Sequence, residues 1–488
     1  MSSLYRASRL GPARAEARKF VSSVESDKYL FESVVEINQA HIVMLGRKGI
    51  ITRNQARKIL RALRRIRAMP KSREAEDVHV AVEEEVTKRA GKSAGGNLQL
   101  AKSRNDQVAT AIRMRLRSEA LQIMDLLIDL LGGLQRIIRK HSKTLTIGRT
   151  HLQPAEPITY GHYLMSFHDA ILRDLERLEE FYDRLNLSPM GGCALAGTSI
   201  SIDRGMVATL LGFEGLVENS LDAVGSRDFA LEFLADMTQL AVDISRLAED
   251  FVFLTTPEVS QLQLPEDLSF TSSIMPQKKN PDVIELIRAK CAVPIGAFSH
   301  TATILHSLPT SYNLDLQEVT PNIWISSRAI QEVTTILHTL VSRTKVRDID
   351  LNRADLAMTT ATELANMLVT ELGVPFRLAH QVVASAAAEF SRGSSQANSW
   401  PELVLQKART MIGKRSEKLK PGLLRAGTLA NIVTHKRSLG SPAPRETLRL
   451  LRLRAIALRQ IVSRQRARRA RLASAKARLR QEALRLSR

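Results

Sequence analysis

The sequence predicts an all-α protein with three helical domains, of which the central one is a bundle of long helices. Only 4% of its 488 residues are aromatic, whereas Leu, Ala and Arg are abundant, and this balance favours helices over β-sandwiches or barrels. Apolar residues also recur at steps of three and four along several long stretches. We find no alternating run typical of a central strand and no repeat of fixed period, so a sheet-based fold is not expected.

Four stretches have the periodicity of long helices. They are residues 107–140, residues 158–184, residues 221–255, and a stretch that begins after Pro281 and continues to about Pro294. Apolar faces of this length must be buried against one another, and a bundle of long helices achieves this. Shorter helices are predicted before residue 103 and after residue 350, the latter near residues 353–372 and 377–391.

The pattern divides the chain into four segments. They are an N-terminal helical domain at 1–102, the central bundle domain at 103–352 with a serine-containing loop near 265–281, a C-terminal helical domain at 353–463, and a basic tail at 464–488. The tail is inferred from the charge, because the chain carries +21 and residues 441–488 alone carry +13. The rest of the chain is only mildly basic.

Two interpretations of this basic end stay open. Arginine-rich segments bind polyanions through counterion release, but no recognised nucleic-acid-binding module accompanies this one, so we expect contact with nucleic acid to be secondary at most. Alternatively, the end is a docked helix, because its apolar residues form one helical stripe and the arginines occupy the solvated face. That stripe comprises Leu448, Leu451, Ala455, Leu458 and Val462.

The cysteine count and the uncharged stretches indicate the compartment. Cys193 and Cys291 are the only cysteines, so a disulfide framework is excluded and a reduced, cytoplasmic location is expected. The first twenty residues lack the apolar core of a signal peptide. The longest stretch without charged residues, 291–314, contains two prolines and two histidines and is a poor membrane span, so no membrane contact is expected.

Four polar segments interrupt the helical background, at residues 103–107, 148–154, 219–228 and 271–282. Taken alone, the first three have structural explanations such as helix caps and surface ion pairs. Capping does not explain Arg104, however, because a guanidinium fork suits a carboxylate. His151 is an acid/base candidate at neutral pH, although histidines are also common buried residues.

The fourth segment is the most informative. Asn280 is a good N-cap and Pro281 a good first helical residue, so a helix is predicted to begin there with its positive dipole end facing the loop. Hydroxyls, ammonium groups and a helix N-terminus together make an anion site. The alternative is a solvated basic loop.

This segment, SSIMPQKKNPD, resembles the signature loop of the fumarase/aspartase superfamily, and its version is most similar to that of the argininosuccinate lyase family, to which delta-crystallin is related. Further segments agree in the expected order between residues 20 and 392: EDVHVAVEEEV, SRNDQVAT, GRTHLQPAEP, GGCALAGTSISIDR, NSLDAVGSRDF and LPTSYNLDLQE. The resemblance implies three helical domains and a homotetramer with a twenty-helix core and active sites shared between subunits. It also implies reversible cleavage of argininosuccinate to L-arginine and fumarate, the last step of arginine biosynthesis, with no cofactor and no metal.

The resemblance assigns the catalytic roles to three residues. Ser272 matches the family's catalytic serine, His151 its catalytic histidine, and Glu285 a glutamate that orients the histidine. Ser272 needs activation because its ordinary pKa is far too high, and Lys278 and the following helix dipole are the expected source. The direction of proton transfer stays open, and we favour Ser272 as the base and His151 as the acid over the reverse.

The resemblance also implies the substrate contacts. Ser23, Asp27, Tyr312 and Gln317 match positions that meet the arginine portion. The fumarate-side carboxylates are expected to contact Arg104, Asn105, Thr150, Lys278 and Asn280.

The sequence departs from the family pattern at several of these motifs. Thr271 replaces a glycine, and a β-branched residue resists positive φ. Leu314 replaces a basic residue, Thr320 a substrate-binding lysine, and residues 99–102 a His-Thr-Gly-Arg segment. We expect these changes to alter affinity and recognition of the arginine portion, not to remove the catalytic set.

Two other functions compete with this interpretation. Another fumarate-releasing lyase such as adenylosuccinate lyase is disfavoured by the QKKNPD and YNLDLQE segments. A catalytically weak, crystallin-like structural protein does not need Ser272, His151 and Glu285 together.

Overall fold

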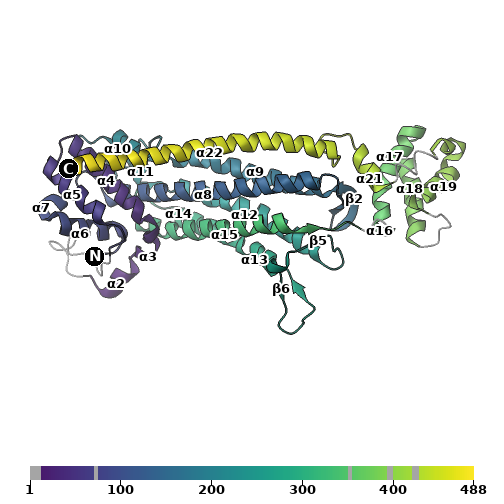
Figure 1. Cartoon of the computed structure of the whole chain (residues 1–488), viewed down its shortest axis with the longest axis horizontal. Coiled ribbons are helices and arrows are strands. Elements are labelled where there is room, and N and C mark those ends of the chain that lie inside the picture. The colour runs from purple at the N-terminus through teal and green to yellow at the C-terminus, as the bar shows by residue number, and fades with distance from the viewer. Residues whose placement is uncertain (1–12, 71–74, 350–353, 393–398, 420–427) are drawn as a thin grey trace.

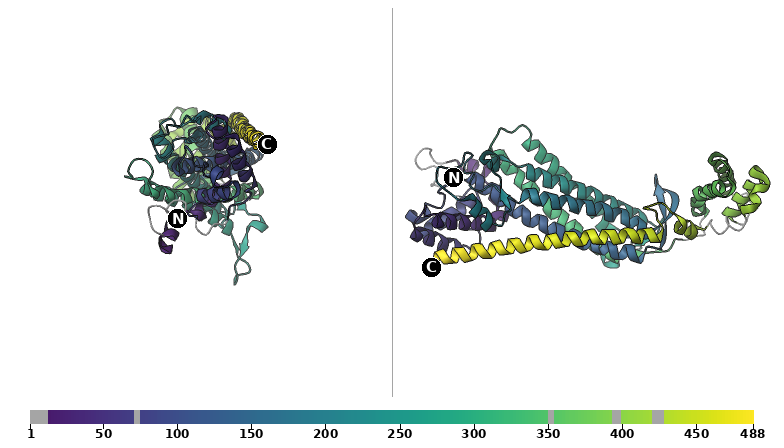
Figure 2. Two further views of the ribbon diagram at one scale, coloured as in Figure 1. Left: turned by 90° about the vertical axis from the view of Figure 1, so that its left-hand side faces the viewer. Right: turned by 90° about the horizontal axis from the view of Figure 1, so that it is seen from above.

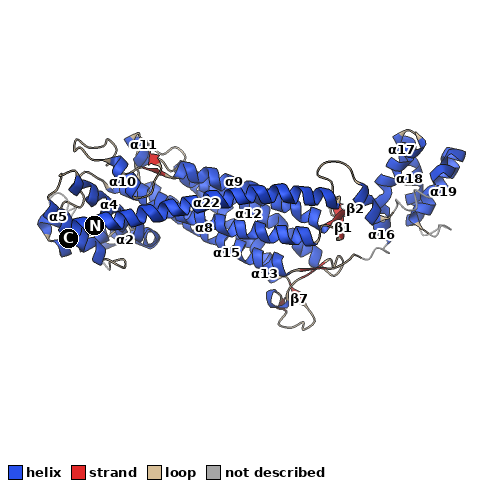
Figure 3. Ribbon diagram, turned by 45° about the horizontal axis from the view of Figure 1, so that its top comes forward, coloured by secondary structure: helices blue, strands red, loops and turns tan. Residues whose placement is uncertain are grey.

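The computed structural model describes residues 13–70, 75–349, 354–392, 399–419 and 428–488. The molecule is elongated, with long helices along its length, a cluster of N-terminal helices at one end and a second helical cluster at the other (Figure 1). The strands in the described ranges are short and form small two-stranded pairs (Figure 3). The prediction of an all-α fold with a central bundle of long helices is confirmed.

Five helices form the bundle: α8 (Arg104–Lys140), α9 (Tyr160–Leu185), α12 (Asp228–Thr255), α14 (Ala292–Leu305) and α15 (Val319–Arg343). α8 packs against α9 and α15, and α12 packs against α9 and α14. The predicted apolar stripes are the buried faces, as Phe233, Leu240 and Leu247 on α12 are fully buried. Burial of this apolar surface, at about 25 cal/mol per Å², is the main stabilising contribution to the bundle.

Two predicted long helices are each divided in the structure. The stretch at 221–255 consists of α11 (Ser220–Gly225), capped by Asn219, and α12, with a break at Arg227. The helix that follows Pro281 is α13 (Asp282–Lys290), and α14 begins two residues later. Pro294 explains the second break, because its ring nitrogen cannot donate to the carbonyl of Lys290 in a continuous helix.

The N-terminal cluster shares one hydrophobic core with the bundle. Its helices are α2 (Ala15–Phe20), α3 (Val24–Asp27), α4 (Phe31–Arg47), α5 (Arg53–Arg65), α6 (Val78–Ala90) and α7 (Lys92–Gly95). The cluster at the other end has a core of its own around Leu364, Val382, Trp400 and Leu403. It contains α16 (Ala354–Ala357), α17 (Ala361–Leu372), α18 (Phe376–Ser391) and α19 (Trp400–Ile412), in agreement with the helices predicted near 353–372 and 377–391.

The predicted basic tail is wrong, because residues 464–487 are the second half of one continuous helix, α22 (Pro444–Ser487). The expected boundary at 463/464 falls inside this helix, which packs on α9, α8, α4 and α5 and ends against the N-terminal cluster (Figures 1 and 2). The buried stripe continues beyond the predicted one through Gln465, Leu479 and Ala483. The positive charge of this segment does not indicate a solvated tail, because acidic residues of the neighbouring helices neutralise many of its arginines.

The remaining elements are short. The strand pairs are β1 (Leu145–Thr150) with β2 (Gln153–Thr159), β3 (Leu187–Ser188) with β4 (Gly215–Leu216), β5 (Leu262–Gln263) with β8 (Lys345–Val346), and β6 (Phe270–Thr271) with β7 (Lys279–Asn280). Two further helices are α10 (Arg204–Leu210) and α21 (Leu429–His435). The 3-10 turns are η1 (Lys28–Leu30), η2 (Glu266–Leu268), η3 (Leu314–Glu318), η4 (Met358–Thr360) and η5 (Gly413–Leu419). Within the described ranges, no helix combines the length and apolar composition needed to cross a bilayer.

Candidate functional site

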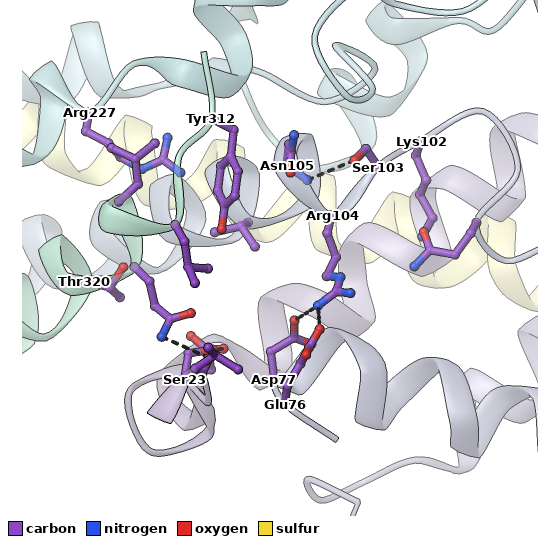
Figure 4. A pocket seen from close by; sticks show the side chains of 17 residues that line it. Ser23, Glu76, Asp77, Lys102, Ser103, Arg104, Asn105, Arg227, Tyr312 and Thr320 are labelled. Atoms are coloured by element: carbon purple, nitrogen blue, oxygen red, sulfur yellow. Dashed lines mark hydrogen bonds and ion pairs between the residues drawn. The ribbon is translucent and has the colours of Figure 1, made fainter. Parts of the chain in front are cut away.

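A cavity of about 510 Å³ lies where the N-terminal cluster meets the first turn of α8 and the start of α15 (Figure 4). Segments distant in the sequence meet there, because α8 and α15 are neighbours in the bundle and residues of α3 and of the segment just before α6 complete the lining. Six of the predicted substrate residues line this cavity: Ser23, Asp27, Arg104, Asn105, Tyr312 and Gln317. The structure therefore brings together half of the twelve predicted site residues in one chain.

Arg104 begins α8, whose N-cap Ser103 accepts a hydrogen bond from the Asn105 amide at 3.3 Å. The guanidinium donates to Asp77 Oδ2 at 2.7 Å and to the carboxylate of Glu76. Burial lowers the pKa of Arg104, but these two carboxylates outweigh burial and hold the pKa above its usual value. The cation expected to bind a substrate carboxylate is therefore engaged by carboxylates of the protein itself.

Asp27 faces the cavity from α3 and accepts a hydrogen bond from Ser23 Oγ. Burial raises the pKa of Asp27 to about 7, against the lowering effect of the Ser23 hydrogen bond and with a further increase from Asp77. A cation bound beside this carboxyl would favour its ionised form. The pair is thus suited to a positively charged substrate group.

The cavity contains further charged residues for which the sequence analysis assigned no role. Lys102 is buried, contacts Asn38 Oδ1, and has a pKa lowered by burial to about 7, although Asp106 and Glu83 oppose this shift. Arg227 lies across the cavity from Arg104 (Figure 4). Lys102 directly precedes the polar segment 103–107, and Arg227 lies inside the polar segment 219–228. These two segments were the sequence features from which a role for the two residues could have been predicted.

The catalytic serine candidate, Ser272, lies elsewhere, directly after β6 in the loop that joins β6 to β7. This hairpin projects from the bundle (Figure 1). Ser272 Oγ accepts hydrogen bonds from the backbone amides of Met275, at 3.1 Å, and Ile274, at 3.4 Å. Two amide donors favour a negatively charged oxygen. These two contacts differ from the predicted ones with Lys278 and the helix dipole.

One prediction about this loop is wrong, and the departure from the family pattern at Thr271 introduces no backbone strain. Asn280 does not cap a helix, because it lies in β7 and α13 begins at Asp282 after Pro281. Thr271 is not strained, because it lies in β6 paired with Lys279, and its φ is not positive. An extended strand accepts a β-branched residue, so no glycine is needed there.

The other predicted catalytic residues occupy two more places. His151 is exposed in the turn between β1 and β2, with φ 53°. The predicted substrate residue Thr150 is exposed directly before it, at the end of β1. This hairpin lies at the opposite end of the bundle from the N-terminal cluster (Figure 1). Glu285 is exposed on the first turn of α13 and lines a second cavity with Lys279 and Asn280. A single chain therefore holds the predicted residues in separate groups.

No group of His, Cys, Asp and Glu in the described ranges is arranged to hold a metal ion. Both cysteines are buried thiols, and burial raises the pKa of Cys193 to about 11 and that of Cys291 to about 12.

Comparison with known proteins adds independent findings. Residues 11–296 match the lyase family, and residues 358–426 match the family described as argininosuccinate lyase C-terminal. The argininosuccinate lyase of Methanothrix thermoacetophila is 42% identical over 452 residues, which are 92% of each chain. That of Methanosarcina barkeri is 38% identical, over 91% of each chain.

Two solved structures have the same fold. An EDDS lyase in complex with formate superposes with a TM-score of 0.85 at 26% identity, over 99% of this chain and 98% of the other. The class II fumarase of Schistosoma mansoni superposes with a TM-score of 0.67 at 20% identity, over 80% and 89% of the two chains, which supports the fold alone.

The long-helix bundle and these matches define an enzyme, a lyase of the fumarase/aspartase superfamily. Within that superfamily, the chain belongs to the argininosuccinate lyase family. The resemblance drawn from the sequence motifs is thereby confirmed. The roles of the individual site residues stay predictions.

Proposed function

We propose that this enzyme reversibly cleaves argininosuccinate to L-arginine and fumarate, as the last step of arginine biosynthesis in the cytoplasm. The observation that carries the proposal is the composition of the first cavity. Argininosuccinate has three carboxylates, an ammonium and a guanidinium group, and the lining offers both signs of charge. Its cations are Lys102, Arg104 and Arg227, and its acids are Asp27, Glu76 and Asp77.

The reaction removes a weakly acidic proton next to a carboxylate and expels a guanidino nitrogen. It therefore needs a base, an acid, and positive charge where the carboxylate becomes doubly charged. We assign the base to Ser272, whose oxygen the amides of Ile274 and Met275 stabilise as an alkoxide. Lys278, which follows in the same loop, would stabilise the carbanion, and no cofactor or metal is required.

His151, oriented by Glu285, is then the acid that protonates the leaving nitrogen. A carboxylate beside an imidazole raises its pKa and fixes its tautomer. The reverse assignment, with His151 as the base and Ser272 as the acid, stays the alternative.

Assembly is part of the proposal, because the catalytic groups lie apart in one chain. We propose a homotetramer in which one site combines the cavity of one subunit with the serine loop and the histidine hairpin of others. Exposed large apolar residues on the bundle and on α13 support this, since such patches mark association surfaces. They are Val242, Leu286, Val293, Ile295 and Ile325.

The test is fumarate release by the purified enzyme from argininosuccinate and, in parallel, from adenylosuccinate. Turnover of argininosuccinate alone supports the proposal, whereas preference for adenylosuccinate would replace it with the rival lyase. No fumarate from either substrate, in protein of confirmed tetrameric mass, would favour a crystallin-like role.

A further inference from the structure

Arg227 has a buried guanidinium edge that the protein leaves unused. The side chain is 3% exposed, at the break between α11 and α12. Its Nη1 donates to the carbonyl oxygens of Ser226, at 2.7 Å, and Val224, at 3.3 Å. Nε and Nη2 are buried and have no hydrogen-bond partner, and Arg227 forms no ion pair with any residue in the described part of the chain. A buried cation with free donors is costly unless an anion completes it.

The free edge has the geometry of a carboxylate site. Nε and Nη2 form the side of a guanidinium that binds both oxygens of one carboxylate. Three other arginines in the described part of the chain pair in this way, the first of them Arg449, which donates to the two oxygens of Glu446 at 2.9 and 2.6 Å. Arg454 donates through Nε and Nη2 to the two oxygens of Asp169 at 2.8 and 2.9 Å, and Arg464 does the same to Glu179 at 3.0 and 2.5 Å.

Arg227 lines the cavity on the side of the residues expected to meet the arginine portion. Figure 4 shows Arg227, Tyr312 and Thr320 together on one side and Arg104 and Lys102 on the other. The guanidinium on that other side, Arg104, is held by carboxylates of the protein, so the unsatisfied cation faces the arginine side.

A second buried cation, Arg113, makes the binding of an anion next to Arg227 more favourable. Arg113 is buried and electrostatically coupled to Arg227, and its guanidinium lies 4.2 Å from the ring centroid of Phe229. Asp228, the adjacent acid, is exposed. Two cations buried near each other repel, and a carboxylate from the cavity relieves this repulsion.

We infer that Arg227 binds the α-carboxylate of the arginine portion of the substrate through Nε and Nη2, and thereby determines specificity for an amino acid at this position. The inference rests on the proposed function. The α-carboxylate is the only carboxylate at that end of argininosuccinate, because the other two belong to the succinate portion. Thr320 on the same wall carries no charge, so Arg227 is the cation available there.

The inference is tested in the reverse reaction, where arginine and fumarate are separate substrates and the KM of each can be measured. L-arginine is compared with agmatine, which is arginine without its α-carboxylate, as the partner for fumarate. The variants are Arg227→Met, which removes the fork, and Arg227→Lys, which keeps the charge without the fork. We expect Arg227→Met to raise KM for arginine at least about tenfold and to leave KM for fumarate within about twofold. Arg227→Lys recovers part of this loss.

The preference of the enzyme for arginine over agmatine distinguishes a binding role of Arg227 from a merely structural one, because a structural defect would weaken the reaction with both compounds. The wild type should prefer arginine over agmatine, and Arg227→Met should lose that preference while its reaction with agmatine is unchanged. Because Arg227 also contacts two carbonyls, folding is checked by thermal unfolding and mass in solution. If Arg227→Met does not fold, the affinities of the folded Arg227→Lys protein for arginine and for agmatine are compared by calorimetric titration instead.

Equal losses for arginine and agmatine, or a rise in KM for fumarate instead, would overturn the inference. An enzyme that cleaves argininosuccinate but whose Arg227→Met variant keeps the parental KM for arginine overturns this inference alone. A wild type that releases no fumarate from argininosuccinate refutes the proposed function, and the inference with it.

Discussion

Arg464 and Glu179 form a two-point ion pair that ties the C-terminal helix α22 to α9. Arg464 Nε and Nη2 donate to the two carboxylate oxygens of Glu179 at 3.0 and 2.5 Å. Arg468 reaches the same carboxylate, with Nη1 at 3.1 Å from Oε1. Glu179 is buried between these partners, so one acidic residue neutralises two arginines of the segment for which the sequence left both a solvated tail and a docked helix open.

Replacement of Glu179 should therefore destabilise the protein. Glu179→Gln removes the carboxylate that Arg464 and Arg468 share and leaves the mostly buried Arg468 with only the exposed Asp183, and we expect a loss of about 2 kcal/mol in the free energy of unfolding. The measurement is denaturant unfolding at neutral pH. Glu180→Gln is the control, because Glu180 is exposed on the same helix and its replacement should change stability by less than about 0.5 kcal/mol. Equal effects of the two changes would contradict the role of Glu179.

Truncation after Val462 tests the docked helix more severely. It removes the buried side chains of Gln465, Leu479 and Ala483 and exposes the faces of α8 and α4 beneath them. We expect a clear fall in the unfolding temperature, with loss of activity following from loss of structure. Arg466→Ala, a change at an exposed position of α22, should leave the unfolding temperature unchanged. A truncated protein of unchanged unfolding temperature would show that the docked segment contributes no stability.

The C-terminal helix α22 shows which features of the fold the sequence reveals and which it does not. The periodicity predicts most helices to within a few residues, because each helix needs one buried face whatever its partner. It does not reveal the partner. The sequence shows the positive charge of α22, but the acidic residues that neutralise it belong to other helices, such as Asp169 and Glu179. The same limit applies to the hairpin of β1 and β2, whose strands are too short for a clear alternating pattern.

The candidate site was predictable to a different extent. Motif resemblance selected the residues of the cavity, since a motif retains residue types that chemistry requires. It could not reveal that Arg104 is paired with Asp77, or that Arg227 is buried with a free edge. Between Ser226 and Asp228, an arginine has the sequence pattern of a surface ion pair. Its burial depends on how α11 and α12 meet the cavity, which is a tertiary property.

The raised pKa of Asp27 predicts a pH-dependent stability. The pKa is about 7 in the folded chain and 3.8 is the ordinary value, so the folded state binds more protons between these pH values. The contribution of Asp27 to stability therefore falls as the pH rises from about 4 to 7. Asp27→Asn does not titrate, so its stability relative to the wild type should rise between pH 5 and pH 8.

Urea unfolding of both proteins at the two pH values measures this difference. Glu25→Gln is the control, because Glu25 lies on the same helix with its side chain 94% exposed, and its difference from the wild type should not change with pH. A constant difference between Asp27→Asn and the wild type would contradict an elevated pKa at Asp27.

Sharing of active sites between subunits predicts complementation. Ser272→Ala and His151→Asn proteins should each be inactive, and mixed tetramers should contain some sites with neither lesion. With random mixing and with serine and histidine supplied by different chains, roughly a quarter of the sites are intact. The measurement is fumarate release after joint unfolding and reassembly of tagged chains. Mixed tetramers without activity would indicate that both residues of a site come from one subunit.

The Ser272 loop gives the most direct prediction about catalysis. Ser272→Ala deletes the hydroxyl that the amides of Met275 and Ile274 hold, and leaves the substrate cavity at the N-terminal cluster untouched. We expect kcat to fall at least about 10³-fold with little change in KM, as for the loss of a proton-transferring group. Ser273→Ala is the matched control, since Ser273 is the exposed neighbour in the same loop and its replacement should keep most of the activity. A Ser272→Ala enzyme that retains a tenth of the wild-type rate would refute the assignment, because a serine that transfers the proton cannot be replaced by water at so small a cost.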